Sequence, residues 1–166
     1  MTDTPDTPPQ DAPKPPSKRE MRSAARLYSV QALFQMEAAG MSVDRVRREF
    51  YDHRFGMVTD EGDEYIDGDA DLFHQITESA VERQAKIDQM TDRALVAKWP
   101  IARIDPTLRA LFRAAGAELV AGVAPPKVVI TEFVDVAKAF FPEGRESKFV
   151  NAVLDHMARE AKPEAF

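Results

Sequence analysis

Apolar side chains recur every three or four residues along most of the chain, which is the spacing of helices that pack one face against a core. Ser17 and Gly40 bound the first such run, as an N-cap and a C-terminal stop. A second, short helix is expected from Ser42 through Phe50. The next periodic run begins at Asp69 and is expected to continue as one helix into the low nineties.

The second half of the chain carries three further helix patterns. Asp105 and Pro106 start one, as cap and first helical residue, and Gly122 ends it. The prolines at 125 and 126 open another, which is apolar on nearly every side and is therefore expected at the centre of the fold. The last is expected to be capped by Ser147 and to bury Phe149, Val150, Val153, Leu154 and Met157. With no strand pattern longer than VVI at 128–130, the prediction is an all-α fold of about six or seven helices.

Composition divides the chain into a tail and a domain. Residues 1–16 hold half of the twelve prolines and, Met1 apart, no large apolar side chain, so they are expected to form a disordered tail. The helical domain is expected over residues 17–162, with a short C-terminal tail at 163–166. Residues 57–71 form a strongly acidic segment without a basic residue, and we expect a loop there.

Several classes of protein are excluded by composition. The chain has no cysteine, which rules out disulfides, thiolate catalysis and cysteine-ligated zinc and suits a reducing cytoplasm. No run of about 18 apolar residues exists that could span a membrane. The acidic, proline-rich start is unlike a signal peptide. We therefore expect a cytoplasmic protein.

The first predicted helix opens with a basic cluster, although the whole chain has a net charge of −6. Residues 17–26 carry four basic side chains against one glutamate, a local net charge of +3: Lys18, Arg19, Arg22 and Arg26. At about 100° per residue, the four lie within an arc of roughly 100°, beside an apolar face at positions 27, 30 and 34. We expect that apolar face to pack and the guanidinium groups to face solvent, with the exposed stripe ending near Arg26. Because arginine donates to phosphate and stacks on bases, the cluster favours RNA binding, with an ordinary solvated face as the alternative.

Signals of enzymatic chemistry are weak. The three histidines lack ligand spacing, and neither a phosphate-binding loop nor a dinucleotide fingerprint is present. The best metal lookalike spans residues 67–78, where acidic residues fall at four positions of a calcium loop, but Leu72 stands where the sharp turn requires glycine. We expect no catalytic residue, metal or cofactor.

Four segments together resemble the NusB family of bacterial transcription antitermination factors. They are RSAARLYSVQALFQ (22–35), ARIDPTLRALFRAAGAEL (102–119), PPKVVITEFVDVAKAF (125–140) and SKFVNAVLDHMA (147–158). They occur in the family's order and cover most of the chain from Lys18 to about Arg159. Ala117, Thr131 and Ala152 depart from the family pattern. The resemblance implies an all-α fold of two helical sub-bundles.

The resemblance also implies a function. Members of this family bind the boxA sequence of nascent RNA, chiefly ribosomal RNA transcripts, together with the ribosomal protein NusE. With other Nus factors and RNA polymerase they suppress premature termination. A monomer or weak homodimer is expected. The alternatives are an accessory domain of an RNA methyltransferase system and a helical adaptor that binds only proteins.

Matching position by position, the resemblance assigns candidate RNA contacts to both ends of the domain. In the first helix they are Lys18, Arg22 and Arg26, with Arg19 among them and Ser23 at a place that is often basic. Lys148 and Phe149 align with the start of the last helix, near an RNA-facing loop in which Arg145 can add a contact or merely be solvated.

The same matching assigns candidate contacts to the partner protein. Phe34 aligns with an aromatic position near the partner surface, with a buried core position as the alternative. Glu118 follows the departure at Ala117 and is placed on the same surface.

Overall fold

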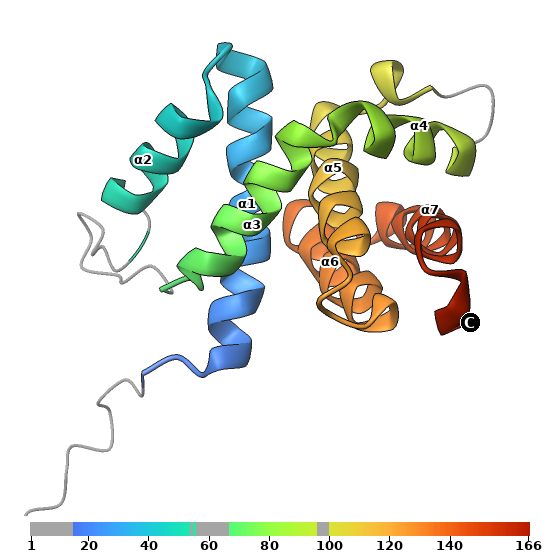
Figure 1. The fold of residues 1–166 in the computed structure, drawn as a ribbon. Helices are drawn as coiled ribbons and strands as arrows, with labels where there is room; N and C mark the ends of the chain where they lie inside the picture. Colours follow the sequence, from blue (N-terminus) through green and yellow to red (C-terminus); the bar gives the residue numbers. More distant parts are fainter. Residues whose placement is uncertain (1–14, 54, 56–66, 96–99) are drawn as a thin grey trace, which may run out of the picture.

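The computed structural model describes residues 15–53, 55, 67–95 and 100–166. Over these residues the chain folds into seven α-helices and two short 3₁₀ helices, with no strand (Figure 1). Residues 1–14 of the expected tail and most of the acidic segment at 57–71 lie outside the described part.

The helices follow one another along the chain in the order α1 to α7. Their bounds are α1 Lys18–Ala39, α2 Val43–His53, α3 Ala70–Glu82, α4 Gln84–Ala94, η1 Ile101–Arg103, α5 Pro106–Ala121, α6 Pro126–Phe140, α7 Arg145–Ala161 and η2 Pro163–Ala165. No helix among the described residues is long and apolar enough to cross a membrane.

The predicted boundaries of α1 and α5 are confirmed. Ser17 forms a capping box with Glu20, in which each side chain pairs with the other residue's backbone N–H. The Asp105 carboxylate accepts from the first backbone N–H groups of α5. Gly40 and Gly122 end the two helices with φ of 65° and 71°, a left-handed conformation in which glycine has no steric penalty.

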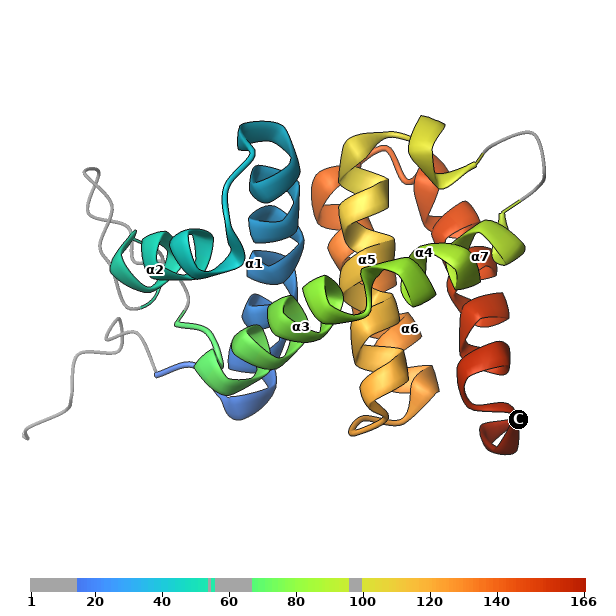
Figure 2. The ribbon, with the colours of Figure 1, turned by 45° about the horizontal axis from the view of Figure 1, so that its top comes forward.

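The single helix expected from Asp69 into the low nineties is wrong, because the chain bends at Arg83. There α3 ends and α4 begins, with φ −114° and ψ 19° at the junction. The bend lets α3 pack against α1 and α5 while α4 reaches α7, and the two helices cross in front of α5 (Figure 2).

The central helix is α5, not α6 as its apolar pattern predicts. Helix α5 packs against α1, α3, α4, α6 and α7. Its run of small residues at 114–117 permits this close packing, since a Cβ added to Gly116 would lie 2.5 Å from Cγ2 of Ile87. Helix α6 instead keeps one face in solvent, where Val128 is 44% exposed.

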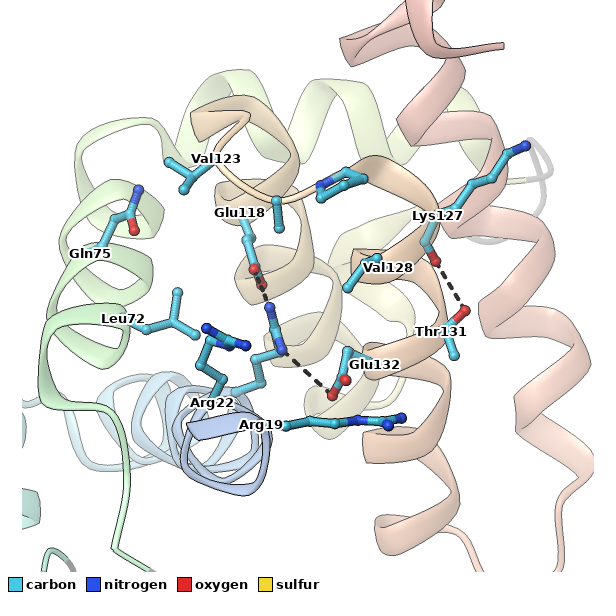
Figure 3. A pocket seen from close by; sticks show the side chains of 13 residues that line it. Arg19, Arg22, Leu72, Gln75, Glu118, Val123, Lys127, Val128, Thr131 and Glu132 are labelled. Atoms are coloured by element: carbon cyan, nitrogen blue, oxygen red, sulfur yellow. Dashed lines mark hydrogen bonds and ion pairs between the residues drawn. The ribbon is translucent and has the colours of Figure 1, made fainter. Parts of the chain in front are cut away.

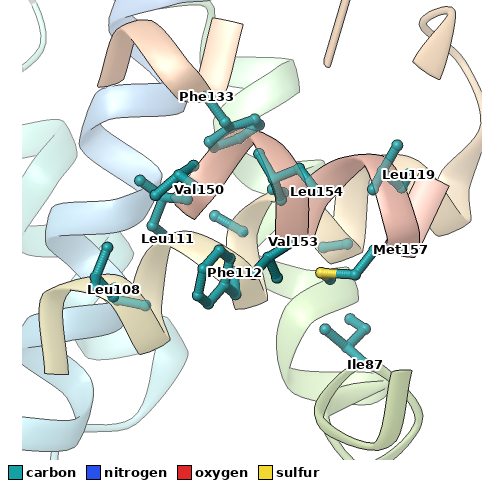
Figure 4. Packing of buried hydrophobic residues seen from close by; sticks show 14 of the residues in the cluster. Ile87, Leu108, Leu111, Phe112, Leu119, Phe133, Val150, Val153, Leu154 and Met157 are labelled. Atoms are coloured by element: carbon teal, nitrogen blue, oxygen red, sulfur yellow. The ribbon is translucent and has the colours of Figure 1, made fainter. Parts of the chain in front are cut away.

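Two hydrophobic cores hold the helices together, consistent with two sub-bundles. The larger lies mainly between α4, α5, α6 and α7 and includes Phe112, Phe133 and Leu154 (Figure 4). The smaller lies between α1, α2 and α3, around Tyr28 and Phe73. Helices α1 and α3 contribute to both cores and so join the sub-bundles.

The start of α7 differs from its prediction in two respects. The helix begins at Arg145, after Gly144 with φ 78°, and the Ser147 hydroxyl donates to the Gly144 carbonyl, so Ser147 is not the cap. Phe149, expected in the buried stripe, is 38% exposed and lies edge-on against Phe112. The other four positions of the stripe are buried.

Candidate nucleic-acid interface

The first two turns of α1 present three cations to solvent. Lys18, Arg19 and Arg22 are exposed, as the helical wheel predicts. Arg26, expected at the end of the same exposed stripe, is only 4% exposed, so this expectation is wrong. The buried arc of α1 is wider than one apolar stripe because α3 and α5 both pack on it.

Arg26 is buried because two carboxylates neutralise it. Its Nε and Nη2 donate to the two carboxylate oxygens of Glu118 at 2.9 and 2.6 Å. Its Nη1 lies 3.5 Å from Oε2 of Glu132. Burial alone would lower the pKa of Arg26, but the hydrogen bonds to Glu118 and the negative charges around it raise the pKa above its ordinary value. The guanidinium group is therefore a permanent cation that joins α1 to α5 and α6.

Ser23, one turn before Arg26 in α1, completes this network. Its hydroxyl donates to Oε2 of Glu132 at 2.8 Å. The side chain named as a candidate RNA contact is therefore engaged with α6. We define the clamp as Ser23, Arg26, Glu118 and Glu132.

Glu118 does not lie on an exposed partner-facing surface. Its side chain is 3% exposed, and both its carboxylate oxygens accept from Arg26. A charged carboxylate at this depth requires its cation, which gives it a structural role inside the fold.

A groove of about 670 Å³ opens beside the clamp, between α1, α3, the α5–α6 turn and α6. Its walls combine charged, polar and apolar side chains (Figure 3): Arg19, Arg22, Arg26, Leu72, Gln75, Glu118, Val123, Ala124, Pro125, Lys127, Val128, Thr131 and Glu132. Arg22 points toward the hollow, whereas the amine of Lys127 points away from it. The groove thus joins cations suited to phosphate with apolar walls suited to a flat ring.

The candidate contacts at the start of α7 lie at the opposite end of the molecule. Helices α1 and α6 run side by side in the same direction, because Ser23 in the first half of α1 meets Glu132 in the middle of α6, and Phe34 further along α1 shares a hollow with Phe140 at the end of α6. Helix α7 starts a few residues after the end of α6, so its first turns, with Arg145, Lys148 and Phe149, are at the same end of the molecule as the C-terminal end of α1 (Figure 2). A helix of 22 residues spans about 33 Å. The structure does not bring the two candidate RNA sets together.

Phe34 lies at this second end and is 40% exposed, so the buried-core alternative does not hold. It borders a shallow, largely apolar hollow of about 370 Å³ with lining from α1, Phe50, Thr107 and Phe140. Exposed aromatic side chains beside an apolar hollow are typical of protein–protein contacts.

The calcium-like positions at 67–78 serve other purposes. The Asp69 carboxylate accepts from the Leu72 backbone N–H at the start of α3, and Glu78 pairs with Arg47 at 2.5 Å. Within the described part of the chain, no group of three or more potential ligands is close enough to hold a metal ion.

Comparison with known proteins settles the family, since residues 23–159 match the model of the NusB family. The chain belongs to the NusB family. The transcription antitermination protein NusB of Maricaulis maris (strain MCS10) is 45% identical over 151 residues, or 90% of this chain and 93% of that protein. That of Brucella abortus (strain S19) is 44% identical over 160 residues, or 95% and 92%. The chain is thus an antitermination factor of this family, a non-enzymatic role.

Solved NusB structures share the fold. NusB of T. maritima superposes with a TM-score of 0.68 at 29% identity, covering 87% of this chain and 96% of that one. A NusB crystallised with NusE and double-stranded RNA gives a TM-score of 0.65 at 19% identity, covering 83% and 96%. At this low sequence identity, the similarity to the second structure supports only a shared fold.

Sequence analysis missed part of the NusB groove. Nothing in the sequence marks Glu132 as part of a binding site, and the wall residues Leu72, Gln75 and Val123 carry no such signal either. Only the resemblance to family segments at 22–35 and 125–140 could have paired α1 with α6.

Proposed function

We propose that this protein binds boxA-type RNA of nascent transcripts, chiefly ribosomal RNA, together with the ribosomal protein NusE. Acting in the cytoplasm with other Nus factors and RNA polymerase, the complex suppresses premature termination. The solved complex of a NusB with NusE and RNA supports this pair of partners. The named relatives are antitermination proteins and not methyltransferases, which favours this role over the accessory-domain alternative.

The observation that carries the proposal is the exposed pair Arg19 and Arg22 on the groove. Both cations come from a helix that the clamp fixes against α5 and α6, and they line the same groove as the apolar side chains of Leu72 and Val128. Phosphates bind the guanidinium groups, and an unstacked base enters the groove.

The second end of the molecule supplies the partner site and a further RNA contact. Phe34 offers an apolar surface to the ribosomal protein, and Arg145, Lys148 and Phe149 offer two cations and an aromatic ring to RNA. RNA that touches both ends must run along the molecule and approach the bound partner.

Fluorescence anisotropy tests the proposal with a labelled boxA RNA and a scrambled control, at several salt concentrations, with and without NusE. We expect the boxA RNA to bind more tightly than the control and NusE to strengthen its binding. Arg22→Ala should weaken binding and reduce the slope of log K against log salt by about 1, since one phosphate contact is lost. Arg103→Ala, an exposed arginine in η1, is the matched control.

Negligible binding in every arm, with protein and partner shown to be folded, would leave the adaptor that binds only proteins. Equal binding of boxA and scrambled RNA, with or without NusE, would reduce the role to general attraction of polyanions.

A further inference from the structure

Glu132 is a carboxylate set among cations in the wall of the groove. Its side chain is 14% exposed, and its Oε2 accepts from Ser23 and lies near Nη1 of Arg26. None of the residues that the structure describes donates to its other oxygen, Oε1. Glu132 therefore has one oxygen committed to the fold and one acceptor left in a groove that we assign to RNA.

The clamp fixes the orientation of this carboxylate. The Ser23 hydroxyl donates to Oε2 at 2.8 Å, and Nη1 of Arg26, a group that can only donate, lies 3.5 Å from the same oxygen, so an oxygen is favoured at the Oε2 position. Two hydrogen bonds to Glu118 hold the guanidinium group of Arg26 in place. Turning that group away from Glu132 would break them. Oε1 is accordingly held in place as an acceptor.

A carboxylate in this position selects what it can contact. It repels phosphate, so the RNA backbone is held at Arg19 and Arg22 and not at Glu132. It accepts from the N–H groups of a base edge, as acidic side chains do with the amino group of cytosine. The nearby apolar side chains of Leu72 and Val128 can contact the base faces.

We propose that Oε1 of Glu132 accepts a hydrogen bond from the exocyclic amino group of one unstacked RNA base in the groove. Adenine, cytosine and guanine carry such a group, and uracil does not. Because the only donor on the base edge of uracil is its ring N3–H, uracil leaves an acceptor placed for an amino group unpaired, and the groove disfavours uracil at one position of the RNA. This inference rests on the proposed RNA function and adds a specificity-determining residue to it.

Glu132→Gln gives an unusual expectation because the guanidinium group of Arg26, which cannot accept, favours an oxygen on the side of the clamp. The glutamine oxygen takes the place of Oε2 beside Ser23 and Arg26, which turns the amide NH₂ toward the groove. The group of residue 132 that faces the base therefore changes from a hydrogen-bond acceptor to a donor. The variant should therefore favour uracil, whose O4 accepts, at the position where the wild type disfavours it.

The experiment is a competition binding assay in which each position of a boxA RNA carries each of the four bases in turn. For the wild type we expect one position at which uracil binds roughly tenfold more weakly than the preferred amino-bearing base, the size of one hydrogen bond to a charged group. Glu132→Gln should abolish or reverse that preference and leave the other positions unchanged. Glu82→Gln, which removes an exposed carboxylate at the far end of α3, should leave all positions unchanged.

A second measurement uses only the wild-type protein and so does not depend on the folding of a variant. At the sensitive position the base loses its amino group: pyrimidin-2-one replaces cytosine, purine replaces adenine or inosine replaces guanine. We expect a similar, roughly tenfold loss of affinity with an unchanged salt slope, since no phosphate contact is involved.

Two results overturn the inference in distinguishable ways. If Glu132→Gln binds RNA with every positional preference intact, or if removal of the amino group has no effect at any position, Glu132 is only part of the clamp and the RNA function stands. If the wild type binds no RNA, the proposed function fails and this inference fails with it.

Discussion

Arg22 and Arg26 are one helical turn apart, yet their surroundings give them different roles. Arg22 is exposed at the groove, whereas Arg26 is buried and bonded to Glu118 through both carboxylate oxygens. A helical wheel cannot separate the two, because the difference comes from a carboxylate 92 residues away in the sequence.

We predict opposite effects of alanine at these two positions. Arg26→Ala leaves Glu118 buried without its cation and should lower the free energy of unfolding by about 3–5 kcal/mol. Arg22→Ala should change it by less than about 0.5 kcal/mol while weakening RNA binding. Urea denaturation at neutral pH measures the first effect and anisotropy the second.

The double variant Arg26→Met/Glu118→Leu is the matched control for the clamp. Because it removes both buried charges, it should recover most of the stability that Arg26→Ala loses. A double variant no more stable than Arg26→Ala would mean that the size and shape of these side chains matter more than the paired charges.

Glu37 makes the stability depend on acid pH. Hydrogen bonding to Arg109, helped by the charge of Arg113, lowers the pKa of Glu37 below its ordinary value of 4.5. The contribution of this pair is therefore present above about pH 4.5 and is lost as the pH falls through the lower, folded-state pKa. Thermal melts of Glu37→Gln should show a lower Tm than wild type at pH 7 and a smaller fall in Tm between pH 5 and 3. Parallel pH profiles for the two proteins would contradict this assignment.

At the scale of elements, local signals predicted the helix ends well and the packing less well. Ser17, Asp105 and the glycines at 40 and 122 act through their own backbone and nearest neighbours, so their positions are readable from the sequence. The bend at Arg83 was not readable, because the apolar stripes of α3 and α4 run almost continuously through it.

The central place of α5 was also hidden by composition. By hydrophobicity alone, the valines and phenylalanines of α6 make that helix a better candidate for the centre of the fold than α5 with its alanines. Close packing reverses the order, since Gly116 and its small neighbours let α4 and α7 approach where a larger residue would collide with Ile87 or Met157. A run of small residues does not by itself show how many helices pack against it, so the central position of α5 could not be predicted from the sequence.

The cap of α1 should matter for RNA binding as well as for stability. Ser17→Ala removes the capping box and should cost about 1 kcal/mol, with fraying of the turn that carries Lys18 and Arg19. Hydrogen exchange at residues 20–22 should become faster, and RNA affinity should fall.

Ser42→Ala is the matched control, because the Ser42 hydroxyl accepts from the Arg45 N–H at the start of α2, away from the groove. A similar loss of stability without a loss of RNA affinity is expected there. Equal RNA affinities for Ser17→Ala and Ser42→Ala would show that the first turn of α1 does not contribute.

On the scale of the whole molecule, the groove and the Phe34 hollow are distinct surfaces at the two ends of α1. The family resemblance identified residues at both ends, but no sequence pattern could show that the two sets are separated. That separation follows from α1 and α6 running in the same direction, a property of the packing alone.

We predict that the two ends act independently until both ligands are present. Phe34→Ala should weaken binding of NusE at least several-fold and leave binding of RNA alone unchanged, and Arg22→Ala should do the reverse. Stability changes of the double variant should be additive within about 0.5 kcal/mol. Isothermal titration of each ligand separately checks the first statement and urea denaturation the second. A loss of RNA affinity in Phe34→Ala without NusE would place both ligands on one surface.

The clamp has a consequence for how the protein is made. A chain leaves the ribosome from its N-terminus, so α1 emerges long before Glu118 and Glu132 do. Ser23 and its partner on α6 are 109 residues apart, and until α6 is released the arginines of α1 have neither their carboxylates nor a groove. The groove proposed to bind RNA is therefore completed late in synthesis, and a nascent chain that stops before α6 carries the basic cluster without the groove.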